Sequence, residues 1–322
     1  MRGERRPVRV VAFGGGHGLA ASLGALCLVR DRGLPLDITA VVTVCDDGGS
    51  SGRLRADRGG LPPGDLRKAL TALVDPRDHV AGQTAELAQH RFGGVDSLAG
   101  HTVGNLMLLG LMELTGDPVV ALDRAAALLR CSGRVLPMSR RPLELEADVR
   151  GPGAAAGRSR LVRGQHAVAV ARGTVETVRL QPGAPPACAE ALDAIRTADW
   201  LIFGPGSWYT SVIPHLLVPD QAAAILASPA KRLVTLNLAV DRETSGLSMP
   251  DHLEALRRYL PGLRVDVVVA DGKAVGDPEP VHRAAESLGA RLVLAPVAVP
   301  DGAARHDPAA LASALEPMLD TA

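Results

Sequence analysis

Several polar, glycine-rich loops hold the residues whose types and spacing could bind a phosphorylated ligand. The first, GGGHGL at residues 14–19, follows the apolar run Val8–Phe13 and precedes a helical pattern. Glycine lets backbone amides approach a phosphate at a helix start, where the amides and the helix dipole favour anions. The loop departs from G-x-G-x-x-G because Leu19 stands at the last glycine, and it lacks the Lys-Ser/Thr of a P-loop. A purely structural tight turn is the alternative.

A second polar loop, DDGGSSG at residues 46–52, follows the apolar run Asp37–Val44. Its adjacent acids stand where a nucleotide-binding α/β unit holds a ribose, and its serines can donate to phosphate or sugar oxygens. The nearby PPGDLR at residues 62–67 adds a third acid for Mg²⁺ or a ligand hydroxyl, and an arginine for a phosphate. The alternative for DDGGSSG is a capped surface turn, and the alternative for Asp65 is a simple cap on the next helix.

Further along the chain, GPGSWYTS at residues 204–211 is a second candidate anion cradle, because its hydroxyls lie beside amides freed by glycine. Two such loops suit a ligand with two anionic or polar ends, such as a nucleotide diphosphate sugar. The run GHTVGN at 100–105 places a histidine and an amide at a helix start, where both could also be structural. Polar residues recur at 237–246 and at 305–307, where Asp307 is expected to cap the last helix.

None of these loops contains a convincing nucleophile with its base, since the sequence has no H-E-x-x-H and no cysteine with a histidine at a recognisable spacing. They fit ligand binding, or a transferase in which positioning and Mg²⁺ do most of the work. If Mg²⁺ binds, we expect it at Asp46, Asp47 and Asp65. The residues expected to bind the ligand are Gly14, Gly15, Gly16, His17, Asp46, Asp47, Ser50, Ser51, Gly64, Asp65, Arg67, His101, Asn105, Gly204, Gly206, Ser207, Tyr209, Thr210, Ser211, Asn237, Glu243, Thr244 and Arg305.

The loops are connected by segments that alternate between strand and helix patterns. Six short predicted strands, separated by predicted helices, indicate an α/β fold with one Rossmann-like, doubly wound and mostly parallel sheet. The first strand–helix–strand unit should be right-handed, and ligands should bind outside the carboxyl ends of the strands. Buried apolar runs predict the strands at 8–13, 37–44, 199–203, 233–237, 265–270 and 291–294, and periodicity predicts a last helix from Asp307 to Leu319.

An insertion interrupts this pattern, and we treat residues 1–322 as a single Rossmann-like domain that carries it at 66–180. Periodicity predicts helices over 66–130. Short alternating runs predict antiparallel strands over 131–180, with one mobile Gly/Ala/Arg-rich loop at 151–160.

Composition narrows the class of protein. The 322 residues are 47% hydrophobic and include 35 basic and 35 acidic side chains, so the chain can bury a core and lacks the basic excess of a nucleic-acid binder. Only 2% of residues are aromatic, which argues against base stacking on single strands. We find no signal sequence and no apolar run of membrane-helix length. We therefore expect a cytoplasmic protein with no nucleic-acid partner and no membrane insertion.

Six motifs, taken in order, point to a family. They are GGGHGL (14–19), TVCDDGGSSGRLR (43–55), PPGDLRKAL (62–70), GHTVGNLML (100–108), FGPGSWYTSVIPHLLVP (203–219) and RHD (305–307). Together they resemble the YvcK-like gluconeogenesis factor family, which is a sister group of the CofD-like phospholactate transferases. GGGHGL with RVLPMS (134–139) looks most like the actinobacterial branch.

The resemblance implies a UDP-sugar-binding regulator, with UDP-N-acetylglucosamine as ligand, required for morphogenesis and cell-wall homeostasis under gluconeogenic growth. It ties Arg305 to the UDP-sugar and implies action by Ser/Thr kinases. We also expect a protein partner in cell-wall synthesis and a homo-oligomer. The alternative is a Mg²⁺-dependent CofD-like phospholactyl transferase, which is the reaction we expect if the chain is an enzyme. An NAD(P)-dependent oxidoreductase is a third reading, against which the absent third glycine argues.

Overall fold

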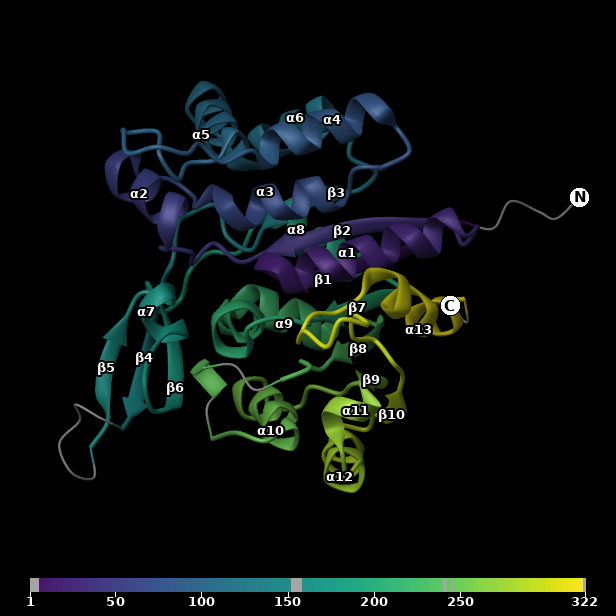
Figure 1. Cartoon of the computed structure of the whole chain (residues 1–322). Helices are drawn as coiled ribbons and strands as arrows, with labels where there is room; N and C mark the ends of the chain where they lie inside the picture. Colours follow the sequence, from purple (N-terminus) through teal and green to yellow (C-terminus); the bar gives the residue numbers. More distant parts are fainter. Residues whose placement is uncertain (1–5, 152–157, 240–241, 245, 321–322) are drawn as a thin grey trace, which may run out of the picture.

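A seven-stranded parallel sheet forms the centre of the molecule (Figure 1). The computed structural model describes residues 6–151, 158–239, 242–244 and 246–320. Within them the strand order is β10-β9-β8-β7-β1-β2-β3, and the predicted α/β class, parallel sheet and strands are confirmed. The strands are β1 (Val8–Gly14), β2 (Leu36–Val42), β3 (Arg134–Pro137), β7 (Trp200–Phe203), β8 (Lys231–Thr235), β9 (Val267–Ala270) and β10 (Arg291–Leu294).

Strand β1 lies inside the sheet because its sequence suits burial on both faces. All of its residues except Arg9 are buried, the continuous apolar pattern of a covered parallel strand. The chain moves from β1 to β2 and β3 on one side, and later to β7, β8, β9 and β10 on the other. Its direction of travel therefore reverses between β1 and β7, and right-handed crossovers place the helices of the two halves on opposite faces.

Helices cover both faces of this sheet. Helix α1 (Gly16–Asp31) packs against α3 (Pro63–Ala72) and α13 (Pro308–Leu319), whereas α8 (Ala189–Thr197) packs against α9 (Pro219–Ala227). Each helix in the described ranges is too short or too polar to cross a bilayer. The remaining helices are α2 (Gly49–Arg58), α4 (His79–Gln89), α5 (Val103–Thr115), α6 (Pro118–Leu129), α7 (Gln165–Ala169), α10 (Met249–Tyr259), α11 (Gly272–Val275) and α12 (Glu279–Ser287), with the π-helical turn η1 (Trp208–Val212) and the 3₁₀ turns η2 (Ile213–Leu217) and η3 (Arg242–Thr244).

Two excursions leave the sheet and lie in different parts of the molecule (Figure 1). Helices α4, α5 and α6 gather over α3. A small antiparallel sheet has the order β5-β4-β6, formed by β4 (Glu144–Arg150), β5 (Arg160–Arg163) and β6 (Thr174–Gln181). Helix α7, which connects β5 to β6, lies at the end of this small sheet nearest the main body.

The structure corrects two predictions about local structure. Residues 131–180 are not all antiparallel, because Arg134–Pro137 pairs in parallel with β2 as an outer strand of the main sheet. Val135 and Leu136 are both buried, a continuous apolar pair that differs from the alternation we expected. The serine and glycine loop after β2 continues into helix α2, which the sequence did not predict. Of the predicted mobile loop at 151–160, residues 152–157 lie outside the described residues.

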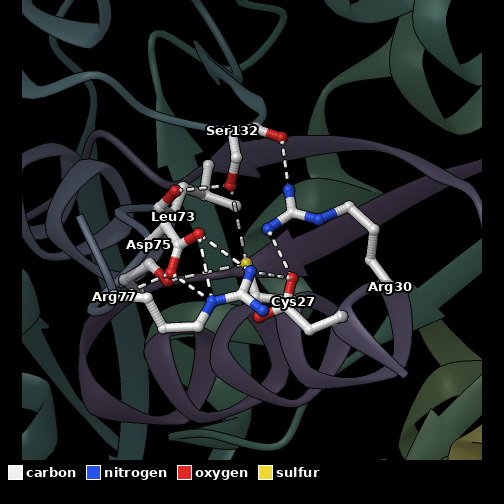
Figure 2. A network of polar contacts seen from close by, with 8 residues as sticks. Cys27, Arg30, Leu73, Asp75, Arg77 and Ser132 are labelled. Carbon is white, nitrogen blue, oxygen red and sulfur yellow. Dashed lines mark hydrogen bonds and ion pairs between the residues drawn. The ribbon is translucent and has the colours of Figure 1, made fainter. Parts of the chain in front are cut away.

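A polar network attaches the helical excursion to α1 (Figure 2). Arg30 Nη1 donates to the Ser132 carbonyl at 2.9 Å, and Ser132 Oγ donates to the Leu73 carbonyl at 2.7 Å. Arg77 Nη2 lies 3.0 Å from Asp31 Oδ1, at the end of the same helix. The segments after α3 and before β3 are thereby held against α1, the helix whose start reaches the candidate site.

Candidate functional site

A cleft of about 590 Å³ lies where the chain changes direction across the sheet, at the carboxyl ends of β1, β7 and β8. Open α/β sheets bind ligands at such a switch point. The walls are the turns after β1 and β7, the segment after β8, and the turn that leads into α13. The predicted ligand contacts that line it are Gly15, Gly16, His17, Gly206, Ser207, Ser211, Asn237 and Arg305.

The turn after β1 brings the start of α1 to this cleft. Gly16 has a φ of 61°, which side chains rarely adopt, and no side chain caps the helix at Gly15. The first-turn amides of α1 therefore stay available to an anion. At Gly18 a Cβ would lie 2.2 Å from the Pro205 carbonyl oxygen, so glycine is what lets α1 touch the turn after β7.

Two hydrogen bonds with the side-chain amide of Asn237 hold the turn after β7. Gly206 N donates to Asn237 Oδ1, and Asn237 Nδ2 donates to the Gly206 carbonyl, both at 2.9 Å. The chain then enters the π-helical turn Trp208–Val212, a conformation that is frequent at functional sites. Ser207 and Ser211 place this turn on the cleft wall. Asn237 thus supports the turn in addition to lining the cleft.

Four residues that we predicted to bind the ligand are instead buried behind the turn and do not line the cleft: Tyr209, Thr210, Glu243 and Thr244. Tyr209 N donates to Glu243 Oε1 at 2.9 Å. Burial raises the pKa of Tyr209 to about 12, so its hydroxyl stays neutral. The Thr210 carbonyl accepts from Gln165 Nε2 of α7 at 2.6 Å, and Thr244 is fully buried. Only tertiary structure could separate these residues from their neighbours Ser207 and Ser211.

Two buried side chains that the sequence did not single out hold the carbonyls of the glycine turns. Ser22 Oγ of α1 donates to the Gly204 carbonyl at 2.9 Å. His215 Nε2 lies 3.3 Å from the Gly14 carbonyl, and Gln221 Nε2 lies 3.0 Å from His215 Nδ1. Because a carbonyl can only accept, Nε2 carries the proton. Burial lowers the pKa of His215 to about 4, which keeps the ring neutral.

Arg305 supplies positive charge at the exposed side of the cleft. Its side chain is 68% exposed, and Nη2 lies 2.9 Å from Asp301 Oδ2. The adjacent His306 also lines the cleft, and burial lowers its pKa. Asp307 caps α13 by accepting from Ala309 N, which confirms that prediction. The turn before α13 therefore contributes an exposed cation next to a capped helix start.

Two of the predicted acids, Asp46 and Asp65, lie beside the turn after β1. A Cβ on Gly15 would come within 2.6 Å of Asp65 Oδ2. Lys68 Nζ lies 3.1 Å from Asp65 Oδ1, so this carboxylate is already paired with an ammonium group. Burial first, and then the charge of Asp65, raises the pKa of Asp46. We call Asp46, Asp65 and Lys68 the acidic corner.

The predicted Mg²⁺ trio does not assemble. Asp47 turns away from the corner, because its Oδ1 accepts from His166 N of α7 at 2.7 Å. Over the described residues, no three His, Cys, Asp or Glu side chains are grouped so that they could hold a metal ion. Asp65 does not cap α3 either, since Pro62 occupies the N-cap position. Two acids, one of them already paired with a lysine, do not fit a preformed magnesium site.

The neighbouring Ser51 and Gly64 bond to each other and join α2 to α3. Gly64 N donates to Ser51 Oγ at 3.0 Å, and a Cβ on Gly64 would lie 2.4 Å from that oxygen. The pair belongs to the contact between the two helices, so the ligand role predicted for it has no support from its geometry.

Ser50 and three further predicted contacts form a buried network away from the cleft. Ser50 Oγ lies 2.9 Å from both His101 Nδ1 and Asn105 Nδ2. Arg67 Nε donates to Asn105 Oδ1 at 2.9 Å, and Arg67 Nη1 donates to Gln89 Oε1 at 2.5 Å. Burial lowers the pKa of His101 and that of Arg67. This serine–arginine cluster joins α2, α3, α4 and α5, and its polar groups face one another.

Comparisons with known proteins agree with the fold. The chain matches the family described as 2-phospho-L-lactate transferase CofD over residues 10–293. A Mycobacterium tuberculosis protein named "Putative gluconeogenesis factor" is 49% identical over 311 residues, which cover 95% of this chain and 89% of that protein. A Bacillus subtilis protein named "Gluconeogenesis factor" is 35% identical over 286 residues, with 88% and 84% covered.

A solved structure supports the same assignment. The crystal structure of a UPF0052 family protein from Bacillus halodurans is similar at a TM-score of 0.83 and 32% identity, covering 97% of this chain and 99% of that one. The match therefore extends over nearly the whole chain. The chain belongs to the CofD family and, within it, to the YvcK-like gluconeogenesis factors.

Proposed function

We propose that this protein is a cytoplasmic regulator that binds a UDP-sugar, with UDP-N-acetylglucosamine as the first candidate, in the cleft between β1, β7 and β8. The observation that carries the proposal is that two glycine turns and the start of α1 meet at one cleft, with Arg305 at its exposed side. Amides, a helix N-terminus and a guanidinium are groups with which proteins hold a diphosphate.

The chemistry of the cleft favours binding over catalysis. Within the described residues, Ser207 Oγ and Ser211 Oγ have no histidine or carboxylate bonded to them that would activate a nucleophile. We infer that ligand occupancy is read by a protein partner in cell-wall synthesis, and that the protein supports cell shape and cell-wall homeostasis under gluconeogenic growth. Homo-oligomer formation and modification by Ser/Thr kinases belong to the same proposal.

Calorimetric titration tests this proposal. The purified protein is titrated with UDP-N-acetylglucosamine, UDP-glucose, GDP and NAD, each with and without Mg²⁺. We expect heat from the UDP-sugars, and a ligand at about 100 times its dissociation constant should stabilise the fold by about 2.7 kcal/mol. No binding of UDP-N-acetylglucosamine at millimolar concentration would refute the proposal.

A phospholactyl transferase is the second candidate, because the matching family carries that description. Asp46, Asp65 and Lys68 do not form a metal site in the described structure, so no reaction step is derived through Mg²⁺. The test is incubation with a nucleotide-diphospho-lactate donor and a deazaflavin acceptor. Formation of the phospholactyl product, together with binding of GDP in preference to UDP-sugars, would favour the transferase over the regulator.

A further inference from the structure

The small antiparallel sheet has one apolar face and one charged face. Side chains alternate along its strands, and Leu145, Ala147 and Val162 are buried on the apolar face. The sheet packs against α7 and the turns η2 and η3. It lies beside the main body with β6 nearest to that body and β5 outermost (Figure 1). The charged face carries Arg163 and Arg179 and takes no part in the cleft, and we name it the arginine face.

Acidic side chains of the middle strand hold the arginines of the two outer strands. The strand register places Glu146 of β4 opposite both Arg163 of β5 and Arg179 of β6. Arg163 Nε donates to Glu146 Oε1 at 2.8 Å, and Arg179 Nε donates to Glu146 Oε2 at 2.9 Å. Arg179 Nη1 also donates to Asp148 Oδ2 at 2.7 Å. Both guanidinium groups are therefore oriented before any partner binds.

The carboxylates of this face lie beneath the guanidinium groups. The side chain of Glu146 is 6% exposed, against 66% for Arg163 and 41% for Arg179. The ion pair of Arg150 with Glu176 is layered in the same way, with 66% of the arginine exposed and 29% of the glutamate. An approaching molecule therefore meets mainly guanidinium groups, although each of them is paired with an acid.

Part of each guanidinium group has no acceptor in the described structure. Arg163 bonds through Nε alone, which leaves both of its terminal nitrogens, and Arg179 bonds through Nε and Nη1, which leaves Nη2. The described residues of 144–181 also include six arginines and four acidic side chains, whereas the whole chain is balanced. Oriented donors in a basic surface bind carboxylates strongly, because little side-chain freedom remains to be lost.

An exposed leucine in the same face indicates what kind of anion binds there. Leu161 lies two residues before Arg163 on β5, opposite Asp148, and is 44% exposed. Protein interfaces combine arginine with apolar side chains, whereas a nucleic-acid backbone has no side chain to cover a leucine. Arg163 and Arg179 are separated by two strand spacings, about 10 Å. The face therefore suits a protein segment with two acidic groups and an apolar side chain between them.

We propose that the arginine face binds an acidic segment of a partner protein, with carboxylates on Arg163 and Arg179 and an apolar side chain on Leu161. As the surface of the partner that reads the cleft, it rests on the proposed function. Helix α7 connects the two regions, because Gln165 Nε2 donates to the Thr210 carbonyl at 2.6 Å, and the next residue along the chain lines the cleft. Recognition of acidic motifs by arginine clusters is a recurring mode of peptide binding.

Fluorescence anisotropy with the full chain tests the proposal. The probe is a fluorescein-labelled peptide of about ten residues, in which glutamates surround one leucine. We expect saturable binding that weakens as ionic strength rises, because exposed charges are screened. Arg163→Gln keeps a donor for Glu146 but loses the charge, and should weaken binding by about 3- to 10-fold. Leu161→Ala should weaken it by about 3-fold.

Arg283→Gln is the matched control, because Arg283 on α12 is 68% exposed and its Nε also lies near a glutamate. Its binding should equal that of wild type, and equal weakening by Arg163→Gln and Arg283→Gln would overturn the proposal. So would the absence of peptide binding by wild type, or equal binding of a peptide with glutamine in place of glutamate. Tighter binding of phosphatidylglycerol vesicles, with the same sensitivity to Arg163→Gln, would assign the face to a lipid surface and overturn the protein partner.

Two further measurements keep the outcomes distinct. Thermal melting shows whether each variant is folded, and Leu161→Ala decides the result if Arg163→Gln is not. Titration of wild type with UDP-N-acetylglucosamine separates the arginine face from the cleft. Binding of the peptide without the nucleotide would refute the proposed function and leave the acidic partner standing. Binding of the nucleotide without the peptide would refute the acidic partner alone.

Discussion

The cleft beside β1 and the serine–arginine cluster use similar side chains for opposite purposes. In the cleft, Ser207 and Arg305 face open volume or solvent, and the first amides of α1 have no side-chain cap. In the cluster, Arg67 and Asn105 are at most 4% exposed and bond to each other and to their neighbours. A polar group that faces water can exchange it for a ligand, whereas one with buried partners contributes to the stability of the fold.

The comparison predicts that changes in the cluster reduce stability most. Arg67→Ala removes two donors and the packing of a buried side chain, and it leaves the buried Asn105 Oδ1 without its partner, so we expect the free energy of unfolding to fall by about 3 kcal/mol. Urea unfolding measures the loss. Arg124→Ala, on the exposed face of α6, is the control and should stay within about 0.5 kcal/mol. A loss below about 1 kcal/mol for Arg67→Ala would mean that the cluster is not structural.

A change between the two turns should affect both properties. Gly18→Ala places a Cβ against the Pro205 carbonyl and should cost about 2 kcal/mol of stability, while it separates the glycine turns and abolishes UDP-sugar binding. Gly110→Ala is the matched control, because nothing lies within 4 Å of its added Cβ on exposed α5. The control should be neutral or stabilising by up to about 1 kcal/mol. Normal binding by Gly18→Ala would show that the spacing of the turns is unimportant.

The cleft itself should affect binding alone. Arg305→Ala should weaken UDP-N-acetylglucosamine by about 10- to 100-fold, since a hydrogen bond to a charged group contributes about 1.5–3 kcal/mol. The melting temperature of the empty protein should not change. Arg283→Ala is closely matched, because Arg283 is also 68% exposed and also lies near a carboxylate four residues earlier. Equal weakening by both variants would point to a general loss of positive charge.

A separate effect concerns the support of the first turn and depends on pH. His215 is neutral in the fold with a pKa of about 4, and the unfolded chain binds its proton near 6.5. The unfolded state therefore binds more protons, so this contribution is present above pH 6.5 and is lost as pH falls toward 4. His215→Gln keeps a donor for the Gly14 carbonyl and removes the titration. Urea midpoints measured from pH 7 to 4.5 should fall more steeply for wild type than for this variant.

Much of the fold could be predicted from the sequence because strands that are buried on both faces give continuous apolar runs. Residues 10–13 and Trp200–Phe203 show that pattern clearly. Helix α2 was missed because Gly49, Ser50 and Gly52 have low intrinsic helix propensity, which tertiary contacts override here. Strand β3 is only four residues long, too short for its period to be read reliably.

The candidate site was harder to predict because loop motifs do not show which way a side chain faces. Ser207 and Tyr209 share one motif, yet the first lines the cleft and the second is buried against Glu243. Lys68 and His215 carried no local signal, since a single lysine in a helix or a single histidine in an apolar run is usually structural. Their relation to the turns follows only from the folded chain.

The cleft has one further consequence, for the order in which the protein is made. Its walls include Gly15–Gly18 and the turn Ala304–Pro308, so an early and a late segment of the chain meet at the cleft. Helix α13, which follows that turn, packs on α1 (Figure 1). A chain emerging from the ribosome can form β1, α1 and β2 long before it has the wall that carries Arg305. A ligand of this cleft, such as the proposed UDP-sugar, can therefore stabilise only chains whose synthesis has passed the start of α13, and shorter chains would stay open to proteolysis at any concentration of it.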